Sequence, residues 1–208
     1  MNTCLITGST SGIGKATALQ LAKKNWHIIL HGRKETLCQQ SRDEIIRETG
    51  NTKIAYIVAD LSLMKEVEKV VKEIEQKFPE LNILVNNAGT VSLNRRLTSE
   101  GIELTWAVNY LSRFLLTNRL LNLLQKNAPS RIIDVAGAYH AKGQIHFDDI
   151  NLDKNYSFGM ANSQAKLANV LFTYKLAEKL KGTKVTVNCL HPGLLERALS
   201  KRQKMYLL

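Results

Sequence analysis

The sequence predicts an α/β fold built on a doubly wound, parallel β-sheet of about six strands with helices on both faces. Three observations support this prediction. Short apolar, β-branched runs alternate along the chain with longer helix-like segments. Runs such as Ile28–Leu30 and Ile83–Val85 are continuously apolar, as in strands buried on both faces. The repeated strand–helix–strand order implies right-handed crossovers between parallel strands.

The strands are expected, in chain order, at residues 2–7, 27–31, 53–59, 82–86, 130–136 and 184–190. The first strand leads into a glycine-rich turn, the third ends at Asp60, and the fourth ends at Asn86. The helices are expected between and after them, at residues 12–25, 34–49, 62–78, 99–127, 158–181 and 194–206. With 208 residues, we expect one domain over 1–193 and a short helical tail over 194–208.

The formal net charge of +11 does not by itself indicate a nucleic-acid-binding protein. Most lysines alternate with glutamates along the expected helices, which is typical of solvated helix faces. The one unbalanced basic block lies in the tail, at Arg197, Lys201, Arg202 and Lys204. We therefore do not expect nucleic-acid binding as a primary function, and keep a basic interaction module in the tail as a third functional hypothesis.

No signal peptide or membrane-spanning run is expected, because a strand follows Met1-Asn2 directly and no apolar stretch approaches ~20 residues. Three widely spaced cysteines, Cys4, Cys38 and Cys189, form neither a metal-binding nor a redox pattern. We expect reduced thiols, no metal site and a cytoplasmic location. Membrane association through the tail stays open, although no anchor supports it.

A glycine-rich segment, Thr7-Gly8-Ser9-Thr10-Ser11-Gly12-Ile13-Gly14, joins the first strand to the first helix. Gly8 can form the tight turn, Gly12 lets the backbone approach a pyrophosphate, and Gly14 allows close helix–sheet packing. The helix N-terminus offers free N–H groups to phosphates, and the hydroxyls of Ser9, Thr10 and Ser11 are further donors. The alternative is a glycine–serine turn without a ligand.

Three further motifs decide between these readings. Asp60-Leu61 follows the third strand, Asn86-Asn87-Ala88-Gly89 the fourth, and Pro192-Gly193 the sixth. Together with the Gly-x-x-x-Gly-x-Gly spacing, they resemble the short-chain dehydrogenase/reductase family over about residues 2–195. The resemblance implies a Rossmann-type fold that binds a nicotinamide cofactor. Asp60 would contact the adenine, and Pro192-Gly193 would lie at the nicotinamide end.

The end of the second strand, His31-Gly32-Arg33, favours NADP(H) over NAD(H). An NAD enzyme usually has an acidic residue there for the ribose 2′-hydroxyl, whereas this chain has Gly32. Arg33 follows it, and a guanidinium suits a 2′-phosphate. The alternative for Arg33 is a solvated loop cation.

Within the superfamily, residues 131–172 and 185–193 most resemble retinol-dehydrogenase-like reductases. The family's catalytic set is Asn-Ser-Tyr-Lys. The resemblance matches Asn109 and Lys166 to the first and last members. The serine position holds Gly137, and the tyrosine position, 25 residues later, holds Asn162. Loss of the acid and of one oxyanion donor predicts severely weakened carbonyl reduction.

Three features could restore some activity. In the first, Asn162 hydrogen-bonds an oxyanion while Lys166 supplies a proton through water. In the second, Tyr139 acts as a surrogate acid. In the third, the substrate is an activated alkene that needs no strong acid. We therefore expect NADP(H)-dependent hydride transfer with a small, unidentified carbonyl, alcohol or alkene. The alternative is a noncatalytic NADP(H)-binding sensor or scaffold.

The C-terminal part departs from the family pattern. Arg197 occupies the usual position of a threonine that holds the carboxamide, and only fifteen residues follow Gly193. We therefore expect the last family strand to be missing, which would leave the sixth strand at an edge of the sheet. Because the family helices that carry Asn109 and Lys166 commonly pair two subunits, the resemblance also implies a homodimer.

Overall fold

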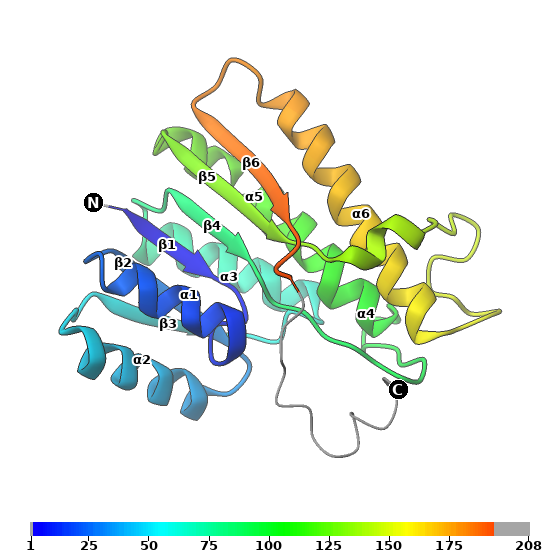
Figure 1. The fold of residues 1–208 in the computed structure, drawn as a ribbon, viewed down its shortest axis with the longest axis horizontal. Coiled ribbons are helices and arrows are strands. Elements are labelled where there is room, and N and C mark those ends of the chain that lie inside the picture. Colours follow the sequence, from blue (N-terminus) through cyan, green and yellow to red (C-terminus); the bar gives the residue numbers. More distant parts are fainter. Residues whose placement is uncertain (1, 194–208) are drawn as a thin grey trace.

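The computed structural model describes residues 2–193 and contains one six-stranded sheet (Figure 1). Every neighbouring pair of strands is parallel, and the order is β3-β2-β1-β4-β5-β6. The predicted six-stranded, doubly wound sheet is therefore confirmed. The strands are β1 (Thr3–Ile6), β2 (His27–Gly32), β3 (Ile54–Val58), β4 (Ile83–Asn86), β5 (Ser130–Val135) and β6 (Val185–Leu190).

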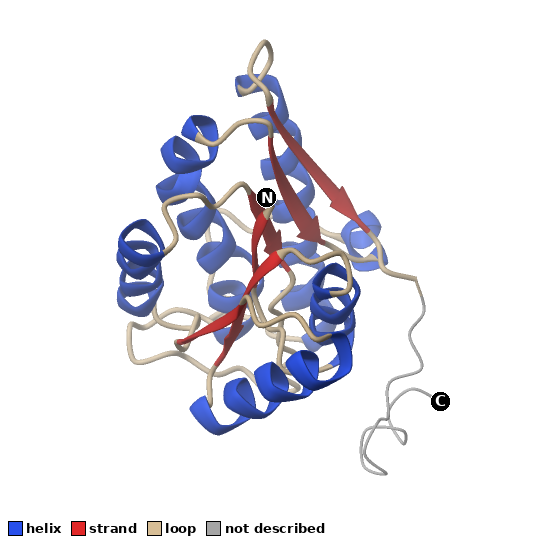
Figure 2. Cartoon of the chain, turned by 90° about the vertical axis from the view of Figure 1, so that its left-hand side faces the viewer, coloured by secondary structure: helices blue, strands red, loops and turns tan. Residues whose placement is uncertain are grey.

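Helices cover both faces of the sheet, as Figure 2 shows. They are α1 (Gly12–Ala22), α2 (Glu35–Thr49), α3 (Met64–Lys77), α4 (Leu104–Trp106), α5 (Ser112–Lys126) and α6 (Phe158–Lys179). Alternate strand residues supply two buried clusters. One joins Leu5 and Leu84 to α3, α5 and α6, and the other joins Ile6 and Ile28 to α1 and α2. This two-sided burial explains why the strands are apolar without interruption.

The order of the strands reverses at the centre of the sheet. From β1 the chain moves outward through β2 and β3, then returns to add β4 on the other side of β1. The carboxyl ends of β1 and β4 meet there, and the Thr7 N–H donates to the Val85 carbonyl at 3.0 Å. In open α/β sheets, this switch point is where ligands bind.

The predicted helix 99–127 begins later than expected and is not uniform. Leu97 and Glu103 form an isolated antiparallel bridge, and the Glu103 carboxylate accepts N–H groups of Thr105 and Trp106. A π-helical turn, Ala107–Leu111, then separates α4 from α5 and contains Asn109. Such turns are often found at functional sites.

β6 lies at an edge of the sheet within the part of the chain that the structure describes. Its Val185 and Val187 are buried in the core, so these side chains do not add to an apolar surface. The predicted tail helix 194–206, with Arg197, lies outside the described residues. None of the helices within residues 2–193 is long and apolar enough to cross a membrane.

Candidate functional site

The glycine-rich loop adopts a conformation that needs its glycines. Gly8 and Gly12 have φ values of +64° and +55°, which L side chains rarely adopt. A Cβ atom on Gly14 would lie 2.5 Å from the Gly8 carbonyl oxygen, so only glycine permits this close packing. The segment therefore forms a compact cradle at the switch point of the sheet.

The cradle leaves the N-terminus of α1 open. The Ser11 side chain makes no capping hydrogen bond, and the first turn of α1 carries no acidic residue. A Cβ on Gly12 would have no atom within 4 Å, so there is free space beside the loop. Unpaired N–H groups facing open space fit a phosphate-bearing cofactor.

Ser9 is the member of the loop that differs most from expectation. Predicted as a ligand donor, it is buried, and its hydroxyl accepts the His31 N–H at 2.9 Å. Its own N–H donates to the His31 carbonyl at 2.9 Å. Thr10 and Ile13 are partly exposed, and Ser11 is exposed. Ser9 thus ties the loop to β2 and leaves Thr10 and Ser11 as the accessible hydroxyls.

His31 is a structural residue of the cradle that the sequence reading missed. Its ring is buried, and its Nδ1 accepts the Gly8 N–H at 3.1 Å. Its Nε2 lies 3.2 Å from the Ala59 carbonyl, so Nε2 carries the hydrogen. Burial lowers the pKa of His31 to about 4, which keeps the ring neutral near pH 7.

The Asn86–Gly89 segment holds the loop from the other side. The Asn87 amide donates to the carbonyls of Thr7 and Gly8 at 2.9 and 3.0 Å. The N–H groups of Asn87 and Ala88 both donate to the Thr7 hydroxyl at 2.9 Å. Gly89 follows at the surface of the switch point. These contacts place Asn87, Ala88 and Gly89 beside the cradle.

Two further pairs of predicted cofactor residues follow strands of the same sheet. Asp60 is partly exposed and accepts the Ser62 N–H at 3.0 Å, while Leu61 is buried. Pro192 and Gly193 follow β6, with Gly193 at φ +84°. Each therefore follows the carboxyl end of a strand, where the predicted site requires it.

Gly32 and Arg33 lie at the end of β2. A Cβ on Gly32 would come within 2.5 Å of the Thr10 methyl group and 2.9 Å of the Cys38 sulfur. An acidic side chain therefore has no room at Gly32 in this conformation. Arg33 is exposed, and it makes no ion pair or hydrogen bond within residues 2–193.

The end of β5 brings Gly137 against Lys166 of α6. A Cβ on Gly137 would lie 3.6 Å from Lys166 Cε, an ordinary contact. The Lys166 amine donates to the Val135 carbonyl at 3.2 Å. Burial and the nearby Arg113 charge lower the pKa of Lys166 to about 7, and Asp134 acts in the opposite direction. The structure thus unites Gly137 and Lys166, as the matched spacing requires.

Asn162 and Asn109 differ sharply in how their side chains are used. Asn162 lies one helical turn before Lys166 on α6 and makes no side-chain hydrogen bond to any described residue. The Asn109 amide instead accepts the Thr90 N–H at 2.7 Å and donates to the Thr90 carbonyl at 2.9 Å. Asn109 therefore holds the chain after Gly89, whereas Asn162 keeps a free amide.

Tyr139 lies in a 3₁₀ turn, η2 (Ala138–Lys142), just after Gly137. It is 43% exposed, and its ring packs edge-on against Phe158 with 5.9 Å between centroids. Its hydroxyl has no hydrogen-bond partner among the described residues. No hydrogen bond joins it to Lys166 in the described part of the chain, so its role as a surrogate acid stays a prediction.

Arg113 and Asp134 are buried charged residues beneath this site that the sequence reading also missed. Arg113 donates to the carbonyls of Val135 and Ala88. Asp134 accepts from the Thr173 hydroxyl. The sequence does show Arg113 within an apolar helix face and Asp134 within an apolar strand. Charged residues at such positions are a signal from which both could have been identified.

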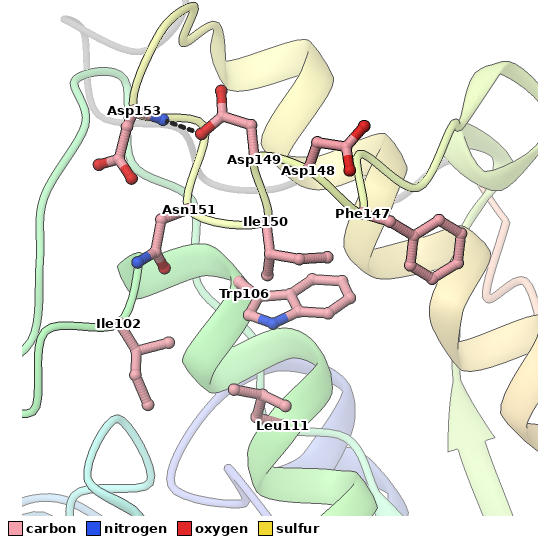
Figure 3. A pocket seen from close by; sticks show the side chains of 9 residues that line it. All are labelled: Ile102, Trp106, Leu111, Phe147, Asp148, Asp149, Ile150, Asn151 and Asp153. Atoms are coloured by element: carbon pink, nitrogen blue, oxygen red, sulfur yellow. Dashed lines mark hydrogen bonds between the residues drawn. The ribbon is translucent and has the colours of Figure 1, made fainter.

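A separate surface pocket of about 340 Å³ lies beside α4 (Figure 3). Trp106 and Ile150 lie against each other in it, and the loop with Phe147 and Asp149 forms its other side. None of its lining residues is a predicted site residue. Within residues 2–193, no group of three or more His, Cys, Asp or Glu side chains could hold a metal ion.

Comparison with known proteins assigns the family. The family model described as short chain dehydrogenase matches residues 2–205. Mouse retinol dehydrogenase 13 is 40% identical over 205 residues, which cover 98% of this chain and 61% of that protein. Human retinol dehydrogenase 14 is 37% identical, with 96% of this chain and 63% of that protein covered. The chain thus spans about three fifths of the length of these relatives.

Solved structures agree with the fold. An uncharacterised protein from Mycobacterium paratuberculosis is 30% identical with a TM-score of 0.81, covering 99% of this chain and 75% of that one. An alcohol dehydrogenase from Thermococcus sibiricus, complexed with 5-hydroxy-NADP, has a TM-score of 0.76 at 21% identity, covering 95% and 78%. The matched family consists of oxidoreductases that bind a nicotinamide cofactor. This chain belongs to the family of short-chain dehydrogenases.

Proposed function

We propose that this protein binds NADP(H) and transfers hydride to or from a small apolar carbonyl, alcohol or activated alkene, at a rate limited by its altered site. The observation that carries this proposal is the placement of Lys166 against Gly137, at the same edge of the sheet as the glycine cradle. A nicotinamide cofactor, when bound, would supply or accept the hydride. Asn162 and Lys166 would contact the substrate oxygen.

The preference for NADP(H) rests on two neighbouring residues. Gly32 leaves no room for the acid that would bind a ribose 2′-hydroxyl. Arg33 is exposed and unpaired among the described residues, so its guanidinium is free to bind a 2′-phosphate. The cradle and the α1 N-terminus would hold the pyrophosphate.

Titration of the protein with NADPH and NADH, followed by fluorescence, tests the cofactor proposal. Hydrogen bonds to charged groups contribute about 1.5–3 kcal/mol, so we expect NADPH to bind about 10- to 100-fold more tightly. Arg33→Ala should remove this preference and leave NADH binding unchanged. Arg47→Ala, which removes an exposed arginine of α2, is the matched control. Equal affinities, or equal effects of both variants, would contradict the role of Arg33.

A second candidate is a noncatalytic NADP(H)-binding sensor or scaffold. It is favoured by the absence of a hydroxyl at both Gly137 and Asn162. Because the relatives are named retinol dehydrogenases, retinal belongs in the carbonyl panel. Steady NADPH consumption with any substrate of the panel supports the enzyme. Tight NADPH binding without consumption supports the sensor. If the protein neither binds nor consumes NADPH, an interaction protein without a cofactor is favoured.

We also propose that α5 and α6 pair two subunits into a homodimer. These helices expose Phe114, Leu171 and Tyr174, and Phe114 packs against Phe172 with 5.0 Å between ring centroids. Exposed aromatic and apolar side chains grouped in this way are typical of interfaces. The basic tail remains a candidate contact for other partners.

Light scattering tests the dimer. We expect the mass of two chains at micromolar concentration and the mass of one chain for Leu171→Glu, because a carboxylate in an apolar interface loses its hydration. Leu37→Glu is the matched control, since Leu37 is similarly exposed but lies on α2. A monomeric native protein, or a control that also dissociates, would rule out this interface.

A further inference from the structure

Arg113 is a fully buried cation that lies under the candidate site. It extends from α5 toward β5, where one guanidinium nitrogen donates to the Val135 carbonyl at 2.9 Å. Another nitrogen donates to the Ala88 carbonyl. Burying a charged guanidinium costs free energy of solvation. Its position beside two backbone carbonyls of the site therefore suggests a specific role.

Lys166 shares one of these acceptors. Its amine lies 3.2 Å from the same Val135 oxygen that Arg113 contacts at 2.9 Å. The two cationic nitrogens are therefore no further apart than the sum of these two distances. A like charge so close, in a site largely shielded from water, disfavours the protonated amine.

The charge of Arg113 is not cancelled by a contact ion pair. Asp134 is the nearby carboxylate, yet no nitrogen of Arg113 comes within salt-bridge distance of it. Arg113 Nε and Asp134 Oδ1 are both buried without a hydrogen-bond partner. Arg113 therefore acts on Lys166 as a like charge that no direct contact neutralises, and Asp134 opposes this effect without touching the guanidinium.

We propose that Arg113 is a positioning residue that, through the carbonyl it shares with Lys166, primes Lys166 to donate the proton that the missing tyrosine would have supplied. This inference rests on the proposed hydride transfer at the same site. The carbonyl carbon of the substrate gains hydride from the cofactor, and the oxygen takes a proton from Lys166 Nζ. The neutral amine then regains a proton from water. Asn162, with its free amide, would hydrogen-bond the same oxygen.

The geometry leaves room for this role. Because Gly137 has no side chain, nothing from that residue covers the Lys166 stem. Asn162 and Lys166 are four residues apart on α6, so they occupy the same helix face. The electrostatic effects on Lys166 come from Arg113 of α5 and Asp134 of β5. Ionisable groups on other elements packed against α6 include Tyr110 of the π-helical turn, Tyr139, His140 and Lys142 of η2, and Cys189 of β6.

Two substitutions should shift the pH at which Lys166 loses its proton in opposite directions. Arg113→Met removes the like charge, so the amine should hold its proton to a higher pH. Asp134→Asn removes the opposite charge, so the amine should lose its proton at a lower pH. A merely structural role would give both variants the same direction of change, because both would loosen the same buried site. Arg113→Lys keeps the charge and should stay close to the native protein.

The test measures reductive methylation of Lys166 with formaldehyde and cyanoborohydride as a function of pH, mapped by peptide mass spectrometry. We expect the midpoint to rise by about 1 pH unit or more in Arg113→Met and to fall in Asp134→Asn. Exposed Lys175, in the same helix and the same digest, is the internal control and should be modified equally in every variant. Should Arg113→Met fail to fold, Asp134→Asn and Arg113→Lys still provide the comparison.

A midpoint that is unchanged in folded Arg113→Met, or that moves the same way in Arg113→Met and Asp134→Asn, overturns the inference. The pH profile of turnover should move with the methylation midpoint. Since the methylation assay needs no cofactor, it separates the two proposals. Opposite shifts without NADPH binding would defeat the proposed function and leave only the charge effect of Arg113 on Lys166 standing. NADPH turnover without shifts would support the proposed function and overturn the role of Arg113.

Discussion

A double variant, Gly137→Ser with Asn162→Tyr, is expected to reduce carbonyls with NADPH about 10²- to 10⁴-fold faster than the native protein. A positioned general acid contributes about 10²–10⁴ in rate, and one oxyanion donor about 10²–10³. The two effects do not multiply simply, because such residues act as a unit. Lys166, already beside Gly137, would then lower the pKa of the new tyrosine as a neighbouring cation.

The structure has room for the serine. Gly137 has an extended backbone with φ 172°, which any residue adopts, and its Cβ would make an ordinary 3.6 Å contact with Lys166. The Asn162 side chain gives up no hydrogen bond to a described residue when it is replaced. Serine at position 137 therefore needs no rearrangement of Lys166, and tyrosine at position 162 breaks no hydrogen bond between described residues.

The measurement is NADPH oxidation with a carbonyl panel that includes retinal. The matched control is Gly137→Ser with Asn162→Phe, which adds the same ring without the hydroxyl. A gain restricted to the tyrosine variant identifies a disabled acid/base site. Equal gains in both double variants would instead assign the effect to packing. No gain despite intact NADPH binding would mean that the loss of the two hydroxyls is not what limits carbonyl reduction.

The sheet could be predicted from sequence because burial on both faces leaves a direct record in the chain. Strand β2 was expected at 27–31 and runs from His27 to Gly32. The helix expected at 99–127 was wrong at its start, because Glu103 is held from far along the chain. Its N–H donates to Asn151, 48 residues away, and no local pattern encodes such a contact.

Some residues of the candidate site could also be predicted from sequence, and others could not. Gly137, Asn162 and Lys166 could be placed by spacing, because a strand end and a helix face keep fixed register. His31 and Arg113 could not be given roles, since their importance depends on backbone groups from other elements. Gly8 and Ala59 surround His31, while Val135 and Ala88 surround Arg113. Tertiary contacts, rather than residue type, determine what these side chains do.

His31 should make the stability of the protein fall in mild acid. Its pKa is lowered to about 4 in the fold, mainly by burial, against about 6.5 in the unfolded chain. Between these values the unfolded chain binds the extra proton, so stability decreases as the pH falls from 6.5 to about 4. A difference of this size corresponds to a loss of about 3 kcal/mol in the free energy of unfolding.

Urea unfolding at a series of pH values from 4 to 7.5 measures this loss. His31→Gln should flatten the acid-side slope, whereas His27→Gln, at a more exposed position on the same strand, should retain it. Equal slopes in the native protein and His31→Gln would show that another group is responsible. Because protonated Nδ1 can no longer accept the Gly8 N–H, acid acts first on the cradle itself. NADPH affinity should therefore weaken together with stability over this pH range, and His31→Gln should uncouple the two.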